Sequence, residues 1–92
     1  MSAAAEMQHF PTGHGKQTLC ILIGIDHVWA GLYTTRERIT PAAIGVSTSL
    51  NTLRYRDHQL HVGQTQFRMT ATAVRRAAHW LRYRGIGIRE LP

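Results

Sequence analysis

Hydrophobic residues recur at every second position in the second half of the chain, which is the period of half-buried β-strands. Three pairs show it, each separated by one polar residue: Leu53 and Tyr55, Leu60 and Val62, and Phe67 and Met69. The sequences RDHQ and VGQT between these pairs contain turn formers. We therefore predict a small antiparallel meander. The positions that face away from its core carry Arg54, Arg56, His61 and Arg68.

A period of 3.6 residues follows the meander and predicts a C-terminal helix. Its apolar side consists of Val74, Ala77, Ala78 and Leu81, with Ala73 and Trp80 at the margins. The opposite side carries Arg75, Arg76, His79, Arg82 and Tyr83. Thr70 or Thr72 is suited to cap the first turn, and Gly85 is suited to end the helix in a left-handed conformation. The sequence GIGIREL from Gly85 onward predicts a short terminal strand.

The first half of the chain is less regular. Residues 1–16 lack a hydrophobic period and predict a flexible N-terminal tail. TLCILIGI, residues 18–25, favours a buried strand, although a buried helix that continues through DHVWAGLY also fits. Residues 41–53 stay open: Thr40 and Pro41 begin a helix well, whereas Ile44, Val46, Thr48 and Leu50 alternate as in a strand.

Together these elements predict an α+β fold, in which a small antiparallel sheet packs against a C-terminal amphipathic basic helix. Residues 17–92 are expected to form a single small domain, since 92 residues suffice for only one modest core.

Charge is distributed unevenly along this chain, whose formal net charge is +6. Residues 51–92 hold eight arginines against Asp57 and Glu90, which accounts for the whole excess. Lys16 is the only lysine among the 11 basic residues. Arginine is the side chain suited to bidentate contact with phosphate or carboxylate. Like charges one helical turn apart repel one another, so the late arginines predict a polyanionic partner more than a merely solvated surface.

Nucleic acid is the partner that fits best, and DNA is favoured over RNA. Arginines position a protein on phosphates and read base edges, while tyrosine and histidine stack or form hydrogen bonds. The predicted binding residues are Arg54, Arg56, Arg68, Arg75, Arg76, His79, Arg82, Tyr83 and Arg84. The function predicted first is therefore non-catalytic binding of nucleic acid, with a regulatory role left open.

A second function remains open, that of a small interaction protein. An inhibitor or adaptor of this kind would dock its basic face on an acidic or nucleic-acid-binding surface of a larger protein. Aromatic residues are common anchors of such interfaces, and this chain has Trp29, Trp80, Tyr33, Tyr55 and Tyr83. An exposed strand edge or the region of Trp29 could also support a homodimer.

No catalytic, cofactor or metal signature is present, so the chain is not expected to be an enzyme. GHGKQT lacks the first glycine and the final serine or threonine of a phosphate-binding loop. His58 and His61 would point to opposite faces of a strand, so they do not form a metal pair. Cys20 lies in an apolar run and is interpreted as core filler.

We expect a cytoplasmic protein without a membrane segment. The longest apolar stretch, Leu19 to Tyr33, is interrupted by Asp26 and His27 and is too short to span a bilayer. The residues before it lack the basic and small-residue features of a signal peptide.

One resemblance concerns about a third of the chain. HQLHVGQTQFRMTATAVRRAAHWL is similar in rhythm to the strand, turn and first helix of the effector domains of OmpR-type response regulators, and RGIGIREL resembles their closing wing. Between Leu81 and Gly85 there is no room for the two helices, including the recognition helix, that separate these pieces in that family. No functional residue is therefore carried over.

Overall fold

Eight strands and one α-helix make up the described part of the chain, residues 6–34 and 45–92 of a computed structural model. The first four strands are β1 (Glu6–Pro11), β2 (Gln17–Ile23), β3 (His27–Thr34) and β4 (Gly45–Ser49). A short 3-10 turn, η1 (Leu50–Thr52), leads to β5 (Leu53–Arg56), β6 (Gln59–Val62), β7 (Thr65–Arg68), the helix α1 (Ala71–Tyr83) and β8 (Arg89–Glu90). The predicted α+β class is confirmed, and the meander and the C-terminal helix lie where the sequence placed them.

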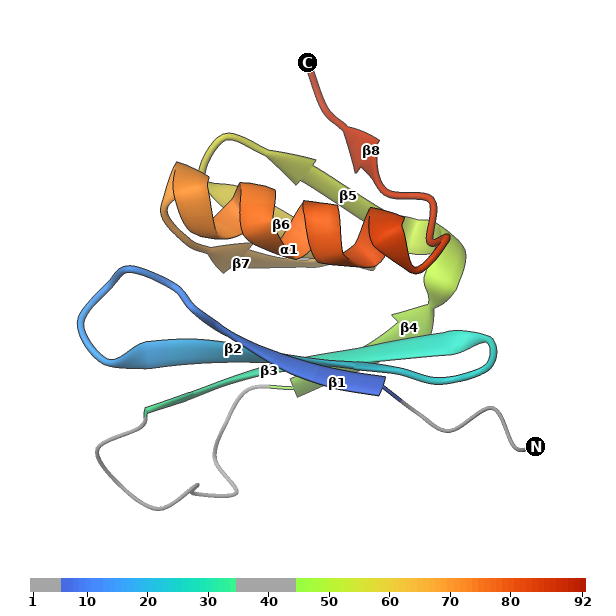
Figure 1. The fold of residues 1–92 in the computed structure, drawn as a ribbon, viewed down its shortest axis with the longest axis horizontal. Helices are drawn as coiled ribbons and strands as arrows, with labels where there is room; N and C mark the ends of the chain where they lie inside the picture. The colour runs from blue at the N-terminus through green and yellow to red at the C-terminus, as the bar shows by residue number, and fades with distance from the viewer. Residues whose placement is uncertain (1–5, 35–44) are drawn as a thin grey trace.

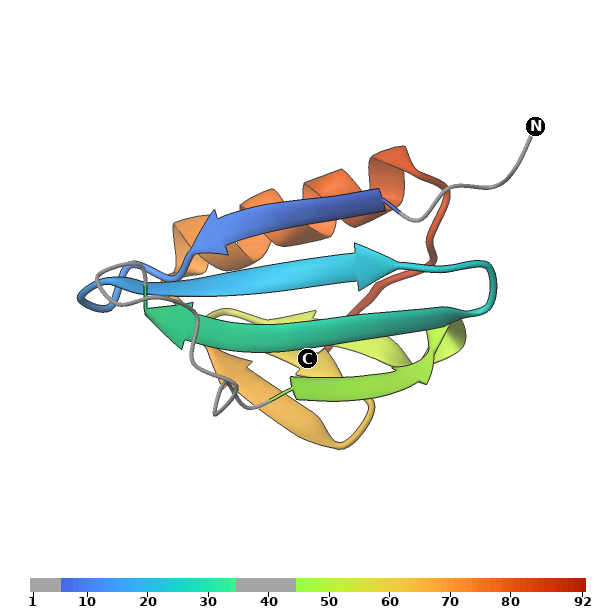
Figure 2. The ribbon, with the colours of Figure 1, turned by 90° about the horizontal axis from the view of Figure 1, so that it is seen from below.

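The strands form two sheets of four, where the sequence predicted one. The first sheet has the order β1-β2-β3-β4 and is antiparallel throughout. The second sheet has the order β7-β6-β5-β8, in which β8 runs parallel to β5. The first sheet forms one layer, and the second sheet and α1 lie together on one side of it (Figures 1 and 2). Two sheets arise because η1 turns the chain out of the first sheet immediately after β4.

The core lies between these layers and uses the alternate residues of each strand. Leu19, Ile21, Val28 and Ala30 of the first sheet are fully buried. Leu60, Phe67 and other inward residues of the second sheet belong to the same hydrophobic cluster. A single core therefore supports both sheets and the helix.

Helix α1 enters this core through small side chains. Its buried residues are Ala73, Val74, Ala77, Ala78 and Leu81, and alanine allows a helix backbone to approach its neighbours closely. The helix begins at the predicted cap, because Thr70 Oγ1 accepts a hydrogen bond from the Ala73 N–H at 3.3 Å. It ends before Gly85, whose φ of 78° is the left-handed conformation expected there.

Three predictions for the first half need correction or completion. Residues 6–11, assigned to the tail, form β1, which pairs with β2 from Glu6 to Pro11. This strand is held by backbone hydrogen bonds, and Phe10 is its only buried residue. It therefore has no hydrophobic period from which a strand could be predicted. HVWAGLY, residues 27–33, belongs to strand β3, and the open region 41–53 is strand from Gly45 to Ser49. Residues 1–5 and 35–44 lie outside the described residues.

One glycine fixes how closely the two sheets approach each other. Gly63, in the turn between β6 and β7, has a φ of 63°. A Cβ atom at this position would lie 3.1 Å from Thr48 Oγ1 of β4. The turn of the second sheet thus rests directly against an edge strand of the first sheet.

Candidate polyanion-binding surface

The outward side of the second sheet carries four arginines, because the register of its strands brings them together. Arg54 is paired with His61 on one side and with Arg89 on the other, and Gln59 stands between Arg56 and Arg68. All four arginines are exposed. We call this surface the arginine face; it consists of Arg54, Arg56, Arg68 and Arg89 with Gln59, His61 and Gln66 between them. It lies on the side of the sheet opposite to α1, whose apolar residues pack with the inward residues.

His61 reports the electrostatic environment of this face. Its side chain is buried at 8% exposure, and its Nε2 atom lies 3.3 Å from Gln59 Oε1. Burial is the main cause that lowers the pKa of His61, and the positive charges of Arg54 and Arg56 lower it further. The imidazole is therefore kept neutral in the middle of a positive surface.

No carboxylate neutralises the arginine face within the described part of the chain. The ion pairs found there join His27 to Asp26 and Arg84 to Glu6. Arg54 instead donates a hydrogen bond from Nη2 to the carbonyl oxygen of Gly63 at 3.3 Å. Its charge remains available to a partner because a backbone carbonyl does not cancel it.

Two hollows adjoin the arginine face. One, of about 550 Å³, is lined by Arg54 and Arg89 together with residues 51–53 and 87–88. The other, of about 380 Å³, is lined by Arg56 and Arg68 with Asp57, His58 and Gln59. Each hollow thus places a pair of arginines at a recess rather than on a flat surface.

The helix contributes a second group of the predicted residues. Arg75, Arg76, His79 and Tyr83 are exposed on α1. Arg82 donates a hydrogen bond to the Tyr55 hydroxyl at 3.0 Å and lies 5.3 Å from the centre of that ring. Arg75 approaches the second sheet, where it lines a small pocket with Arg56, Asp57 and Glu90. The predicted residues therefore form two groups on different elements, which approach each other at Arg56 and Arg75.

Arg84 has a local role instead. Its Nε atom donates to Glu6 Oε1 at 3.0 Å, and its guanidinium carbon lies 4.2 Å from the centre of the Trp80 ring. This arginine fastens the end of α1 to strand β1. Arg89, in contrast, was absent from the predicted set, because the sequence could not reveal that β8 pairs with β5.

The outward side of the first sheet has a different character. Its strand residues include Met7, His9, Cys20, Leu22, Trp29 and Tyr33, and no Arg, Lys, Asp or Glu occurs among the outward residues of its four described strands. We call it the aromatic face. Tyr33 and His9 are hydrogen-bonded at 2.6 Å with their rings nearly perpendicular. Cys20 is buried on this side of the sheet rather than in the main core, and burial raises the pKa of its thiol.

Residues 6–34 and 45–92 contain neither a metal-binding cluster nor a membrane-spanning helix. No group of three or more His, Cys, Asp or Glu side chains is arranged there to hold a metal ion. No helix in those ranges has the length and hydropathy needed to cross a bilayer.

Comparisons of the chain with protein families, with curated proteins and with solved structures found no significant match. The fold is that of a small α+β protein of one domain, and the arginine face gathers four exposed arginines on one side of its second sheet.

Proposed function

We propose that this protein binds nucleic acid, with DNA as the favoured partner, through the arginine face and without catalysis. The observation that carries the proposal is the convergence of Arg54, Arg56, Arg68 and Arg89 on one side of a sheet, with no ion-paired carboxylate there in the described residues. Phosphate contacts supply most of the affinity of such surfaces.

The spacing of the arginines suits a phosphate backbone. Residues two positions apart on a strand are about 7 Å apart, so Arg54 and Arg56 would contact separate phosphates. Each guanidinium can donate two parallel hydrogen bonds to one phosphate. Arg75 and Arg76 of α1 would extend the contact where Arg75 approaches Arg56.

Docking on an acidic groove of another protein is the second candidate. It is favoured by the aromatic face, where Met7 is 57% exposed and Trp29 is only partly buried. Aromatic residues and methionine are enriched in protein interfaces. An adaptor or inhibitor would then use both faces, one for charge and one for apolar contact.

The test is a salt titration of binding to fluorescently labelled duplex and single-stranded oligonucleotides, measured by anisotropy. Affinity is expected to fall linearly on a double-logarithmic plot of salt. In a variant with Arg54→Gln, Arg56→Gln and Arg68→Gln, the slope should decrease by about 2.7 if each arginine neutralises one phosphate. The matched control is Arg75→Gln with Arg76→Gln, which should change the slope less.

Three results would redirect the proposal. If the salt slope decreases more in the Arg75→Gln, Arg76→Gln variant than in the Arg54→Gln, Arg56→Gln, Arg68→Gln variant, α1 is the main contact with nucleic acid. Equal binding by wild type and sheet variant, with both folded by circular dichroism, would remove the arginine face from the site. Negligible binding of every oligonucleotide at about 50 mM salt would leave the acidic protein groove as the function to pursue.

A further inference from the structure

One hollow of the described residues lies where β5 and β8 begin to pair. These strands are parallel, and their pairing begins at Arg54 and Arg89. Before that point the two segments diverge, which opens the hollow of about 550 Å³ between Asn51–Leu53 and Gly87–Ile88. A smaller hollow of about 260 Å³ adjoins it and shares Asn51 and Gly87. We call the two together the terminal groove, bounded by residues 50–54 and 85–89.

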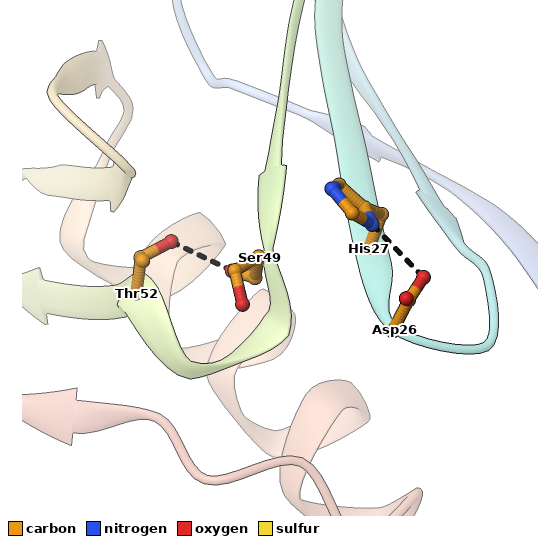
Figure 3. Close-up of polar contacts among 4 residues, drawn as sticks. All are labelled: Asp26, His27, Ser49 and Thr52. Carbon is orange, nitrogen blue, oxygen red and sulfur yellow. Dashed lines mark hydrogen bonds and ion pairs between the residues drawn. The ribbon is translucent and has the colours of Figure 1, made fainter.

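Local hydrogen bonds hold the η1 wall of this groove. Thr52 Oγ1 donates to the Ser49 carbonyl oxygen at 2.8 Å, which closes the turn of η1 (Figure 3). The Leu50 N–H donates to the carbonyl oxygen of Asp26 at 3.3 Å. Asp26 in turn lies 2.9 Å from His27 Nδ1 in the adjacent hairpin (Figure 3).

The opposite wall is attached to β5. Beyond Arg89, the Leu91 N–H donates to the Tyr55 carbonyl oxygen at 2.7 Å. This bond extends the short pairing of β8 with β5 and keeps Arg89 beside Arg54. Both walls are therefore in place before any ligand arrives, which limits the entropy lost on binding.

The two ends of the groove differ in chemistry. At one end Arg54 and Arg89 stand on neighbouring strands, about 4.8 Å apart along the hydrogen-bonding direction. Among the residues that the structure describes, none that lines the groove is acidic. Glu90 points to the other side of the sheet, where it lines the pocket with Arg75. At the other end Leu50 and Ile86, both partly buried against the core, provide apolar surface.

We infer that the terminal groove binds a nucleoside monophosphate unit, with its phosphomonoester between Arg54 and Arg89 and its base against Leu50 and Ile86. A phosphomonoester carries a charge of about −1.5 to −2 at pH 7, so it matches two guanidinium groups better than the single charge of a phosphodiester. The ligand is either the phosphorylated end of a strand or a free nucleotide, and the first of these rests on the proposed function. The groove adds recognition of a strand end to the general attraction of the arginine face.

The experiment compares one oligonucleotide sequence with a 5′-phosphate, with a 3′-phosphate, and with hydroxyl groups at both ends. At fixed salt, one of the two phosphorylated strands should bind about tenfold more tightly than the unphosphorylated strand, as expected for added charge-assisted hydrogen bonds. Arg89→Gln should abolish this difference. Because Arg89 also belongs to the arginine face, the variant should bind the unphosphorylated strand more weakly, with a salt slope smaller by no more than about one phosphate contact. Arg76→Gln on α1 is the matched control and should preserve the difference.

A second arm tests the free nucleotide, with adenosine 5′-monophosphate as the probe in an NMR titration. Shifts of the Arg54 and Arg89 side-chain N–H signals, absent with adenosine, would support the groove even if no oligonucleotide binds and the proposed function fails. Equal affinity for all three oligonucleotides, together with no response to adenosine 5′-monophosphate, would overturn the groove while leaving the proposed function intact.

Discussion

The outward sides of the two sheets are built alike and yet differ in almost every side chain. Each covers the same core from a four-stranded sheet, and the inward residues that belong to this core are apolar. The arginine face carries four guanidinium groups, whereas the aromatic face carries methionine, leucine, tryptophan and tyrosine. Because packing constrains only the inward positions, the fold does not explain this difference. The outward residues are therefore where function has to be sought in this molecule.

The separation of arginines and apolar side chains onto two faces also determines which partners each face can bind. A surface with four arginines that form no ion pair among the described residues repels a second copy of itself and attracts polyanions. The aromatic face has no such net repulsion, and its apolar atoms gain by leaving water. Two adjoining sheets of one small domain thus present two distinct kinds of binding surface.

The largest expected effect tests whether the two faces rest on one core. Ile21 of the first sheet and Leu60 of the second are both fully buried. Ile21→Ala and Leu60→Ala should each lower the free energy of unfolding by about 3 kcal/mol, through lost burial and the cavity left behind. Urea denaturation followed by circular dichroism measures the free energy of unfolding of each variant. A cost well below 1 kcal/mol for only one of them would show that the sheets do not unfold as a unit.

A smaller effect is expected from adding one negative charge to either face. Gln66→Glu places a carboxylate beside His61 in the middle of the arginine face. It should weaken oligonucleotide binding about tenfold, because one phosphate contact is lost and a repulsive one is gained. Ser47→Glu, beside Trp29 on the aromatic face, should leave affinity within about twofold, since a charge on a remote surface is screened by salt. Anisotropy titrations of both variants at the same salt concentration measure these affinities. An equal loss of oligonucleotide affinity in the two variants would contradict the assignment of the binding site to the arginine face.

The smallest effect is a dependence on pH through His61. Its pKa is lowered in the folded protein by burial and by Arg54 and Arg56. Strand β7 places the neutral Gln66 opposite His61, and the neutral Gln59 lies two residues away on the same strand. The contribution of His61 to stability is therefore complete above the ordinary value of 6.5 and is lost as the pH falls below it.

Binding of a polyanion should have the opposite dependence on pH. A phosphate near Arg54 and Arg56 offsets their charge, which raises the pKa of His61 and favours proton uptake. Affinity should thus rise about threefold between about pH 7.5 and pH 5.5. His61→Gln should remove this part of the pH dependence, as measured by anisotropy at constant ionic strength. A pH profile unchanged by that variant would separate His61 from the bound polyanion.

The sequence was sufficient for the elements that carry their own periodic signal. The meander is recognisable because the inward residues of its strands are apolar at every second position, as Leu53 and Tyr55 illustrate. The helix was located by its apolar side, by Thr70 at its start and by Gly85 at its end. These features depend on local chemistry, which can be read directly from neighbouring residues.

Features that depend on pairing between distant segments could not be predicted in the same way. Strand β1 buries only Phe10, so its existence follows from the presence of β2 beside it. Arg89 reaches the arginine face because β8 adds to β5, which lies more than thirty residues earlier. The ion pair of Arg84 with Glu6 joins residues 78 positions apart. The distribution of charge along the sequence therefore predicted that the second half of the chain is basic. It could not predict which of the arginines are exposed and which form an ion pair.

The contact of Gly63 with Thr48 has a consequence for how the two faces act together. A Cβ atom at position 63 would lie 3.1 Å from the Thr48 side chain of β4, so the turn of one sheet is packed closely against the edge of the other. The angle between the surfaces is set by the backbone, so occupation of one should leave the other undisturbed. Effects of substitutions on opposite surfaces should then simply add, and each surface can be redesigned without regard to its neighbour.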